Sequence, residues 1–154
     1  MSRFYVYLKV PTYLEQWMKH TFGDPIVLEK DCPEGRVLNE MLVKLPKDCK
    51  PDTGQDSNIR IGIPYFKGKN PETYNHLHKS GKNALIESFK TLFKKNLMAE
   101  IGSLENIGVN CKTSDLLYAY MEKHGIDQVH WHTISQIYHR TKKRYFVKND
   151  IKIA

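Results

Sequence analysis

The chain has 154 residues, of which 40% are hydrophobic and 27% are charged. This composition is typical of a globular chain with a packed core and excludes a disordered one. The formal net charge of +7 indicates a polyanionic partner, such as nucleic acid or an acidic protein.

Cysteine usage and hydropathy bound the class of protein further. Cys32, Cys49 and Cys111 are odd in number and show no CxxC spacing, which argues against a disulfide framework and against a cysteine-based zinc site. No apolar run reaches membrane-spanning length, and residues 1–5 lack a signal-peptide profile. We therefore expect a cytoplasmic protein with no membrane contact, no metal and no other cofactor.

The N-terminal half predicts short strands that alternate with short helices. Aromatic and aliphatic residues alternate in a β-rich run over 4–10, and isoleucines alternate with Arg60 and Gly62 over 58–64, whereas apolar residues recur at helical spacing in segments between these two strands. The expected elements are strands over 4–10, 25–29 and 58–64, helices over 13–22 and 37–45, and a surface loop over 47–57.

The longest expected helix covers residues 82–101. Its apolar side carries Leu85, Phe89, Leu92, Phe93, Leu97 and Ile101, and its polar side carries Lys82, Lys90 and Lys94. We expect this helix to pack against the helices that follow. The predicted fold class is therefore α+β: a small sheet of about three strands with covering helices in residues 1–70, followed by a helical unit in residues 71–154. The two parts can share one compact domain.

The segment 113–148 predicts a helix, a tight turn and a second helix. Thr113 or Ser114 can cap the first helix, which ends at about His124 because Gly125 follows. The turn is short enough to pack the second helix, over about 129–146, against the first. This outline is that of a helix-turn-helix, in which the second helix enters the major groove of DNA.

The second helix has two distinct faces. Its apolar face recurs at intervals of three and four residues, at Trp131, Ile134, Tyr138, Thr141 and Tyr145. The opposite face predicts base-edge contacts from His132, Gln136, His139 and Arg140. Phosphate contacts are expected from Lys142, Lys143, Arg144 and Lys148, and from Lys82, Lys90, Lys94 and Lys95 of the long helix. The alternative is that this is an ordinary solvated face of a basic protein.

Positive charge is concentrated in two blocks. Residues 79–98 carry a net charge of +4 and residues 130–154 carry +5, whereas residues 1–78 carry +1 and residues 99–129 carry −3. If a helical bundle brings the two blocks together, they form one field that attracts polyanions. The DNA-binding hypothesis therefore expects Lys90 and Lys94 to lie beside Arg140 and Lys143.

Several segments resemble small proteins found in prophage and conjugative-element gene sets of gut bacteria. These segments are 4–10, 106–109, 115–126 and the helix from Trp131 through Tyr138. The resemblance spans most of the chain and carries no catalytic signature. Because such gene sets are rich in regulators and in accessory factors for replication or transposition, the resemblance favours a role with nucleic acid.

Two His-hydrophobic-His triplets, at 76–78 and 130–132, raise the alternative of a metal-dependent single-strand endonuclease. In that class a strand carries the triplet and a helical tyrosine attacks the phosphodiester; Tyr120 with Lys123 is similar to the nucleophile motif. However, residues 130–132 fall in a predicted helix, residues 76–78 fall in a loop with no strand leading into it, and Tyr120 lies on an apolar stripe. A structural metal site is a further alternative that only these histidine pairs support.

We therefore expect a non-enzymatic protein that binds double-stranded DNA. A homodimer is one possible form of it, because helix-turn-helix proteins often bind DNA as pairs. One rival is a protein-interaction or structural module whose basic face meets an acidic partner. A second rival is a single-strand binder that stacks bases on Phe4, Tyr5 and Tyr7.

Overall fold

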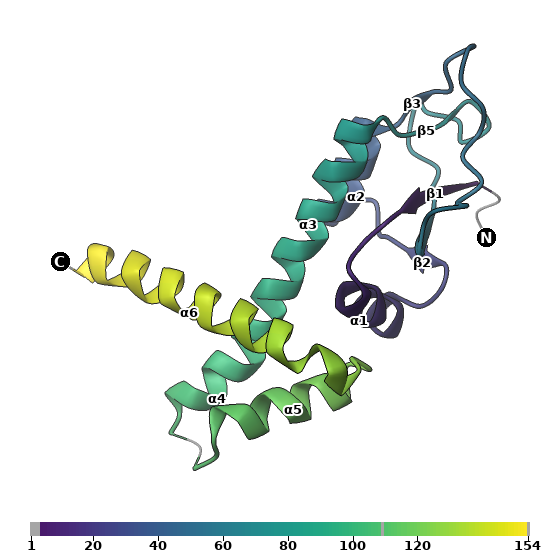
Figure 1. The fold of residues 1–154 in the computed structure, drawn as a ribbon. Helices are drawn as coiled ribbons and strands as arrows, with labels where there is room; N and C mark the ends of the chain where they lie inside the picture. Colours follow the sequence, from purple (N-terminus) through teal and green to yellow (C-terminus); the bar gives the residue numbers. More distant parts are fainter. Residues whose placement is uncertain (1–3, 109, 154) are drawn as a thin grey trace. The chain divides into compact units, whose positions relative to one another are not determined.

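A computed structural model describes the backbone of residues 4–108 and 110–153, and their side chains up to Arg144 (Figure 1). The chain divides into two compact units, residues 1–90 and 91–154. The boundary falls inside the long helix α3 (Lys79–Leu97), so the first part of this helix belongs to one unit and its last turns to the other.

The first unit contains the predicted three-stranded sheet. Its order is β1 (Tyr5–Leu8), β4 (Ile59–Gly62) and β2 (Ile26–Val27), with β4 in the centre (Figure 1). Strand β4 runs antiparallel to β1, with Val6 opposite Ile61, and parallel to β2. The side chains of this sheet that enter the core are Val6, Leu8, Ile26, Ile59 and Ile61.

A second sheet was not predicted. It pairs β3 (Val43–Lys44) with β5 (Tyr74–His76). The expected helix over 37–45 is wrong at its end, because α2 (Pro33–Met41) stops where Leu42 becomes extended and Val43 pairs with His76. The helical spacing of residues 37–45 favoured a longer helix, but strand pairing between Val43 and His76, which lie far apart in the chain, ends the helix at Met41.

Helix α2 also begins earlier than predicted, because the thiol of Cys32 caps its N-terminus. The Cys32 Sγ accepts a hydrogen bond from Gly35 N at 3.2 Å and donates one to the Glu29 carbonyl at 3.0 Å. Pro33 follows at the first helical position, where its missing N–H costs no intrahelical bond. Gly35 is required by the close approach, since a Cβ atom there would lie 2.1 Å from the Glu29 oxygen.

Helix α1 (Thr12–Phe22) and the first part of α3 supply the aromatic part of this core. The rings of Trp17 and Phe22 meet edge-on with centroids 5.9 Å apart, and those of Phe22 and Phe89 meet in the same way at 6.0 Å. Such contacts add to the burial of the rings themselves. Leu85 and Phe89 are buried, as the apolar side of the long helix predicted.

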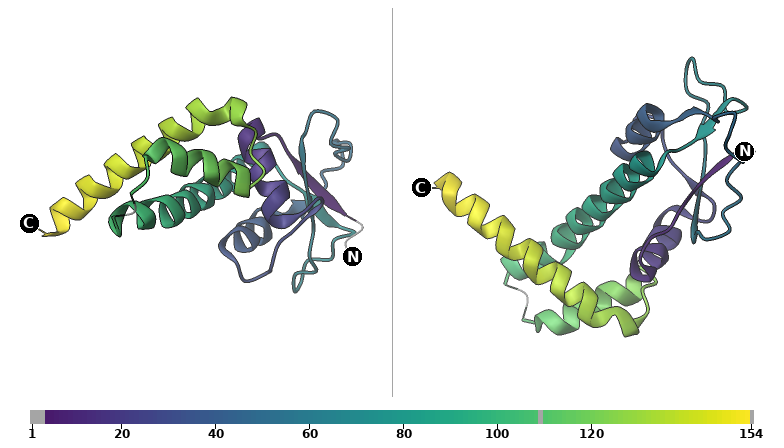
Figure 2. Two further views of the ribbon diagram at one scale, coloured as in Figure 1. Left: turned by 90° about the horizontal axis from the view of Figure 1, so that it is seen from below. Right: turned by 45° about the horizontal axis from the view of Figure 1, so that its top comes forward.

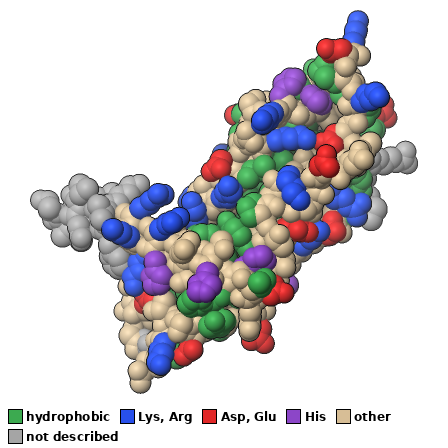
Figure 3. All heavy atoms as spheres, viewed as in Figure 1, with side chains coloured by type: hydrophobic (Ala, Val, Ile, Leu, Met, Phe, Trp, Pro, Cys, Tyr) green, Lys and Arg blue, Asp and Glu red, His purple; other side chains and the backbone are tan. Residues whose placement is uncertain are grey.

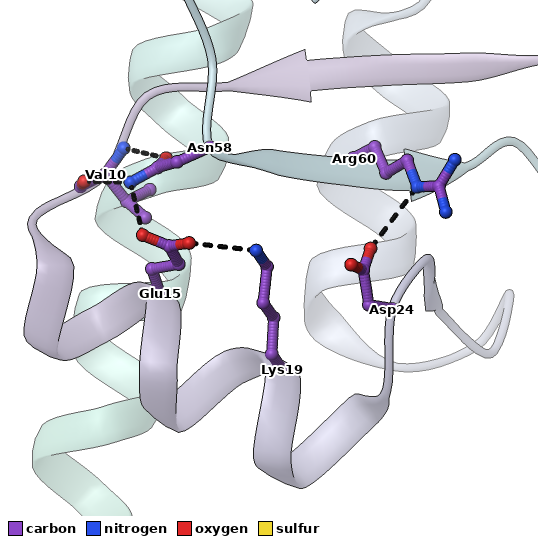
Figure 4. A network of polar contacts seen from close by, with 6 residues as sticks. All are labelled: Val10, Glu15, Lys19, Asp24, Asn58 and Arg60. Atoms are coloured by element: carbon purple, nitrogen blue, oxygen red, sulfur yellow. Dashed lines mark hydrogen bonds and ion pairs between the residues drawn. The ribbon is translucent and has the colours of Figure 1, made fainter. Parts of the chain in front are cut away.

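A polar network joins the end of β1 to α1 and β4 (Figure 4). Asn58 pairs reciprocally with the backbone of Val10: its Oδ1 accepts from Val10 N at 2.9 Å, and its Nδ2 donates to Val10 O at 2.7 Å. The same Nδ2 donates to Glu15 at 3.1 Å, and Glu15 pairs with Lys19 at 2.8 Å. The Asn58 side chain thus continues the β1–β4 pairing beyond Leu8.

The second unit is helical. Beyond α3 the chain continues through a π-helical segment, η1 (Met98–Gly102), and α4 (Ser103–Asn106). Helix α5 (Thr113–Lys123), a short 3-10 helix η2 (Gln128–His130) and α6 (Trp131–Ile153) follow (Figure 2). The two predicted helices of the pair therefore form, and α6 extends further than expected.

The last turns of α3 pack against α5, as the sequence predicted. Phe93 meets Tyr120 edge-on at 6.3 Å, and the Tyr120 hydroxyl donates to Asn96 Oδ1 at 2.6 Å. Leu92, expected to point inward, is only half-buried. The buried apolar side chains of this unit are Phe93, Leu97, Ile101, Leu117, Tyr120, Met121, Ile126, Ile134 and Tyr138.

Two general features of the described residues bear on the sequence expectations. None of their helices is long and apolar enough to cross a membrane. All three cysteines are free thiols, with Cys49 and Cys111 exposed and Cys32 half-buried.

Replacing Asn58 with alanine is expected to lower the free energy of unfolding by about 1–3 kcal/mol, because the buried Val10 backbone groups lose their partner. Urea denaturation followed by circular dichroism measures this change. The matched control is Asn83→Ala at an exposed position of α3, which should change the free energy by less than about 0.5 kcal/mol. Equal losses in the two variants would contradict the role given to Asn58.

Candidate nucleic-acid interface

The turn between α5 and α6 is fixed by the C-terminal cap of α5. Gly125 has a φ of 70°, the left-handed conformation that glycine adopts without steric cost. Ile126 N donates to Met121 O at 2.9 Å, and Gly125 N donates to Glu122 O at 3.4 Å. This is a Schellman motif, completed by apolar burial of Ile126 and Met121. The predicted helix end at Gly125 is confirmed.

The predicted cap at the start of α5 is wrong. Lys112 occupies the capping position, and among the described side chains no capping hydrogen bond forms there. Thr113 instead turns toward α4, where its Oγ1 donates to Glu105 Oε1 at 2.7 Å. Because the helix begins at Thr113, this residue lies inside the first turn rather than at the capping position, and its hydroxyl serves as a donor to the carboxylate.

Burial of one side of α6 leaves the opposite side in solvent. Ile134 and Tyr138 are fully buried, and Trp131 and Thr141 are half-buried. The exposed residues include all four predicted base-contact residues and two of the predicted phosphate-contact residues: His132, Gln136, His139, Arg140, Lys143 and Arg144. At 3.6 residues per turn these six positions cover an arc of about 140°. We call them the α6 polar face.

Helix α6 packs on its unit through its first turns and extends beyond that unit at its C-terminal end. The last turns of α6 project beyond α4 and α5 in all three ribbon views (Figures 1 and 2). The space-filling view shows histidine, lysine and arginine side chains gathered on one face of this unit (Figure 3). The side chains of Tyr145 and Lys148, also named from the sequence, lie outside the described ones.

Three of the lysines predicted to contact phosphate have acidic partners. Lys82 pairs with Asp52 at 2.6 Å, Lys90 with Glu87 at 3.6 Å, and Lys142 with Glu105 at 2.5 Å. Among the side chains that the structure describes, no ion pair forms at Lys94, Lys95, Arg140, Lys143 or Arg144. The cations of the second unit therefore differ in how much charge they leave for a ligand.

A groove of about 580 Å³ lies in the second unit, where the last turns of α3 meet α6. Lys94 and Lys95 line it from α3, Met98 and Ala99 line it from η1, and Thr141 lines it from α6. It places two lysines of the first basic block beside α6. Arg140 and Lys143 are not among the residues that line this groove, and Lys90 belongs to the first unit, so the expected convergence of these charges stays a prediction.

Glu105 links α4 to both helices of the pair. Its carboxylate accepts hydrogen bonds from Thr113 at 2.7 Å and from Lys142 at 2.5 Å. Partial burial acts to raise the pKa of Glu105, but the bonds from Lys142 and Thr113 outweigh it and hold the pKa below its usual range. Burial raises the pKa of Tyr138, and the nearby Glu105 carboxylate raises it further.

Glu100 plays a similar part at the other end of α5. It contacts His124 Nε2 at 3.0 Å and Lys123 Nζ at 3.3 Å. Burial acts to raise the pKa of Glu100, but the bonds from His124 and Lys123 lower it overall. The acidic stretch between the two basic blocks thus binds particular cations of the helix pair.

The two histidine triplets occupy different kinds of structure. The expectation that no strand leads into residues 76–78 is wrong, because His76 ends β5 by pairing with Val43. The rings of His76 and His78 lie 5.1 Å apart, and partial burial together with the charges of His78 and Lys82 lowers the pKa of His76. Residues 130–132 lie in η2 and α6, as predicted.

An endonuclease of this class would need an accessible tyrosine and a cluster of metal ligands. Tyr120, the nucleophile of that alternative, is 2% exposed and donates its hydroxyl to Asn96. Within the described part of the chain, no group of three or more His, Cys, Asp or Glu side chains is arranged to hold a metal ion.

The first unit has a larger groove, of about 720 Å³, beside β2 and β4. Its lining is rich in aromatic and proline side chains and includes Phe4, Tyr5, Tyr65, Pro25, Pro64 and Pro71. Tyr65 is 64% exposed, and Arg60 lies over the Tyr5 ring at 5.4 Å. Arg60 also pairs with Asp24 at 3.3 Å (Figure 4). Sequence reasoning named Phe4 and Tyr5 but missed Tyr65, which lies in a loop without periodicity.

Comparison of the chain with protein-family models, with curated proteins and with solved structures gave no match. The function of these surfaces is therefore inferred from their own chemistry.

Replacing Glu105 with glutamine is expected to lower the free energy of unfolding at neutral pH by about 1 kcal/mol, because the partly exposed Lys142 loses its carboxylate. The pKa of Glu105 is lowered in the folded protein, so its contribution is complete above the ordinary carboxyl pKa and is lost as the pH falls through the lowered value. Denaturation at a series of pH values should show the two proteins converging in acid.

The control for this series is Glu122→Gln, an exposed carboxylate on α5. Its stability should stay close to that of the parent at every pH. A Glu105→Gln deficit that does not shrink in acid would contradict the assignment of the effect to the ionised carboxylate.

Proposed function

We propose that the protein binds double-stranded DNA through α6 and catalyses no reaction. The observation that carries the proposal is the exposure of the α6 polar face, all of whose members point to solvent on one side of one helix. Arginine reads guanine O6 and N7, glutamine reads adenine N6 and N7, and histidine offers both a donor and an acceptor. The face thus has the side-chain types that read base edges.

The shape of the second unit supports the same proposal. The major groove of DNA is wide enough to admit one α-helix, and α6 carries its polar face on the side opposite the buried Ile134 and Tyr138. The short α5–α6 turn packs α5 against α6, and this connection supports a comparison with the helix-turn-helix. Gly125 and the buried Ile126 give that turn its geometry.

Electrostatics supports it as well. Lys143 and Arg144 form no ion pair among the described side chains, and Lys94 and Lys95 lie beside the same helix. Cations that are not already neutralised within the protein are the ones that release counterions from DNA. The resemblance of several segments to proteins of mobile-element gene sets favours, as part of the proposal, a regulator or accessory factor of such an element.

The double variant Arg140→Ala, Lys143→Ala is expected to bind duplex DNA more weakly and with a flatter dependence on salt. Removing one phosphate contact should reduce the slope of log K against log salt by about 0.9, and removing one base contact costs about 1–3 kcal/mol. Fluorescence anisotropy with a labelled duplex across a range of salt concentrations measures both quantities.

The charge-matched control for this experiment is Lys47→Ala, Lys50→Ala. Both lysines are exposed in the loop between β3 and β4, and their removal changes the net charge by the same amount. Its binding should follow the parent closely. Unchanged affinity and slope in the α6 variant would overturn the proposal.

Single-strand binding in the first unit is the second candidate function. The groove with the exposed Tyr65, and with Tyr5 beneath Arg60, offers the flat rings on which unpaired bases stack. The Asp24 carboxylate already pairs with Arg60, so this groove offers less positive charge than the α6 polar face. For this reason we place it second.

A comparison of duplex DNA, single-stranded DNA and RNA at one salt concentration separates the candidates. Preference for the duplex supports the α6 proposal. Preference for a single strand, abolished in Tyr65→Ala, supports the second candidate and counts against the first. Retention of none of the three supports an acidic protein partner for the basic face.

A further inference from the structure

The two edges of the α6 polar face differ in charge. On one edge, Thr141 lies one helical turn before Arg144, and residues three apart are neighbours on a helix surface. Thr141 is also the α6 residue that lines the groove with Lys94 and Lys95. This edge therefore continues from Arg144 into the lysine-lined groove.

The opposite edge leads to a neutralised cation. Lys142 follows His139 by three positions, but its ammonium lies 2.5 Å from Glu105 and 5.8 Å from the centre of the Tyr138 ring. The lowered pKa of Glu105 keeps this carboxylate ionised at neutral pH. Because Glu105 neutralises Lys142, this side of the helix offers little positive charge to a ligand. The ion pair therefore argues against the sequence-based prediction that Lys142 contacts phosphate.

The groove itself has the chemistry of a sugar–phosphate backbone site. Lys94 and Lys95 supply ammonium groups, Thr91 and Thr141 supply hydroxyl groups, and no acidic side chain occurs among its described lining residues. Met98 and Ala99 add an apolar surface of the kind against which a deoxyribose packs. Phosphate oxygens accept hydrogen bonds from donors of these types in most protein–DNA contacts.

We infer that this groove seats the phosphodiester backbone of one DNA strand, so that the protein contacts the duplex asymmetrically. The inference rests on the proposed function and extends it. When α6 lies in the major groove, a backbone flanks each edge of the helix. The DNA strand on the Thr141 side contacts Arg144, Lys94 and Lys95. The DNA strand on the other side faces Lys142, whose charge is already paired with Glu105.

The test is the double variant Lys94→Gln, Lys95→Gln, measured for duplex binding across salt concentrations. Lysine and glutamine have similar helix propensities, so α3 should be retained, and circular dichroism checks this. Removing two phosphate contacts should reduce the slope of log K against log salt by about 1.8. If the two lines meet at 1 M salt, this slope corresponds to a fall in affinity of about 60-fold at 0.1 M.

Two control proteins make the result specific. Lys47→Gln, Lys50→Gln removes the same charge from exposed positions in the loop between β3 and β4, away from the groove lining. Glu105→Gln, Lys142→Gln replaces the ion pair on the opposite edge with two uncharged side chains and leaves the net charge unchanged. Both should bind with nearly the parent slope.

A fall in slope confined to the groove variant supports the inference. A groove variant with the parent slope, or with a fall no larger than that of the charge-matched control, overturns it. If Arg140→Ala, Lys143→Ala still weakens binding in that case, the proposed function stands and only the asymmetric contact fails. Absence of salt-dependent duplex binding by the parent protein overturns both.

Discussion

The second unit depends on the burial of Ile134 and Tyr138, which fixes how α6 is rotated about its own axis. Burying such side chains removes a large apolar area from water, and a rotation of α6 that exposed them would forfeit that gain. The rotation in turn decides which residues face solvent. His132, Gln136 and Arg140 are exposed because they lie opposite the buried pair. The candidate interface is thus a consequence of core packing.

Acidic residues determine which cations of this unit remain accessible. Glu105 holds Lys142, and Glu100 holds Lys123 and His124, in bonds that also tie α4 and η1 to the helix pair. The stretch of net charge −3 between the two basic blocks therefore does more than separate them. Its carboxylates form ion pairs that stabilise the fold with Lys123, His124 and Lys142, whereas other cations, such as Lys143, remain accessible to a ligand.

The sequence predicted those features whose signal is local. Apolar periodicity and Gly125 gave the helix pair, and alternation gave the three-stranded sheet. What the sequence did not reveal depends on contacts between distant residues: the β3–β5 pairing that ends α2 early, the use of Thr113 by Glu105, and the ion pair of Lys142. In the candidate site, the exposed face followed from helical spacing, whereas the availability of each charge required the tertiary structure. The alternation in β1 named Tyr5, but no pattern marked Tyr65.

The most direct measurement of the central claim is an NMR titration of the 18.0 kDa protein with a short DNA duplex. We predict that the largest chemical-shift changes fall on α6 between His132 and Arg144, with a second group around Lys94 and Lys95. The resonances of β1, β2 and β4 should shift little. Duplex binding that leaves the α6 resonances unchanged, or that moves chiefly those around Tyr5 and Tyr65, would contradict the account.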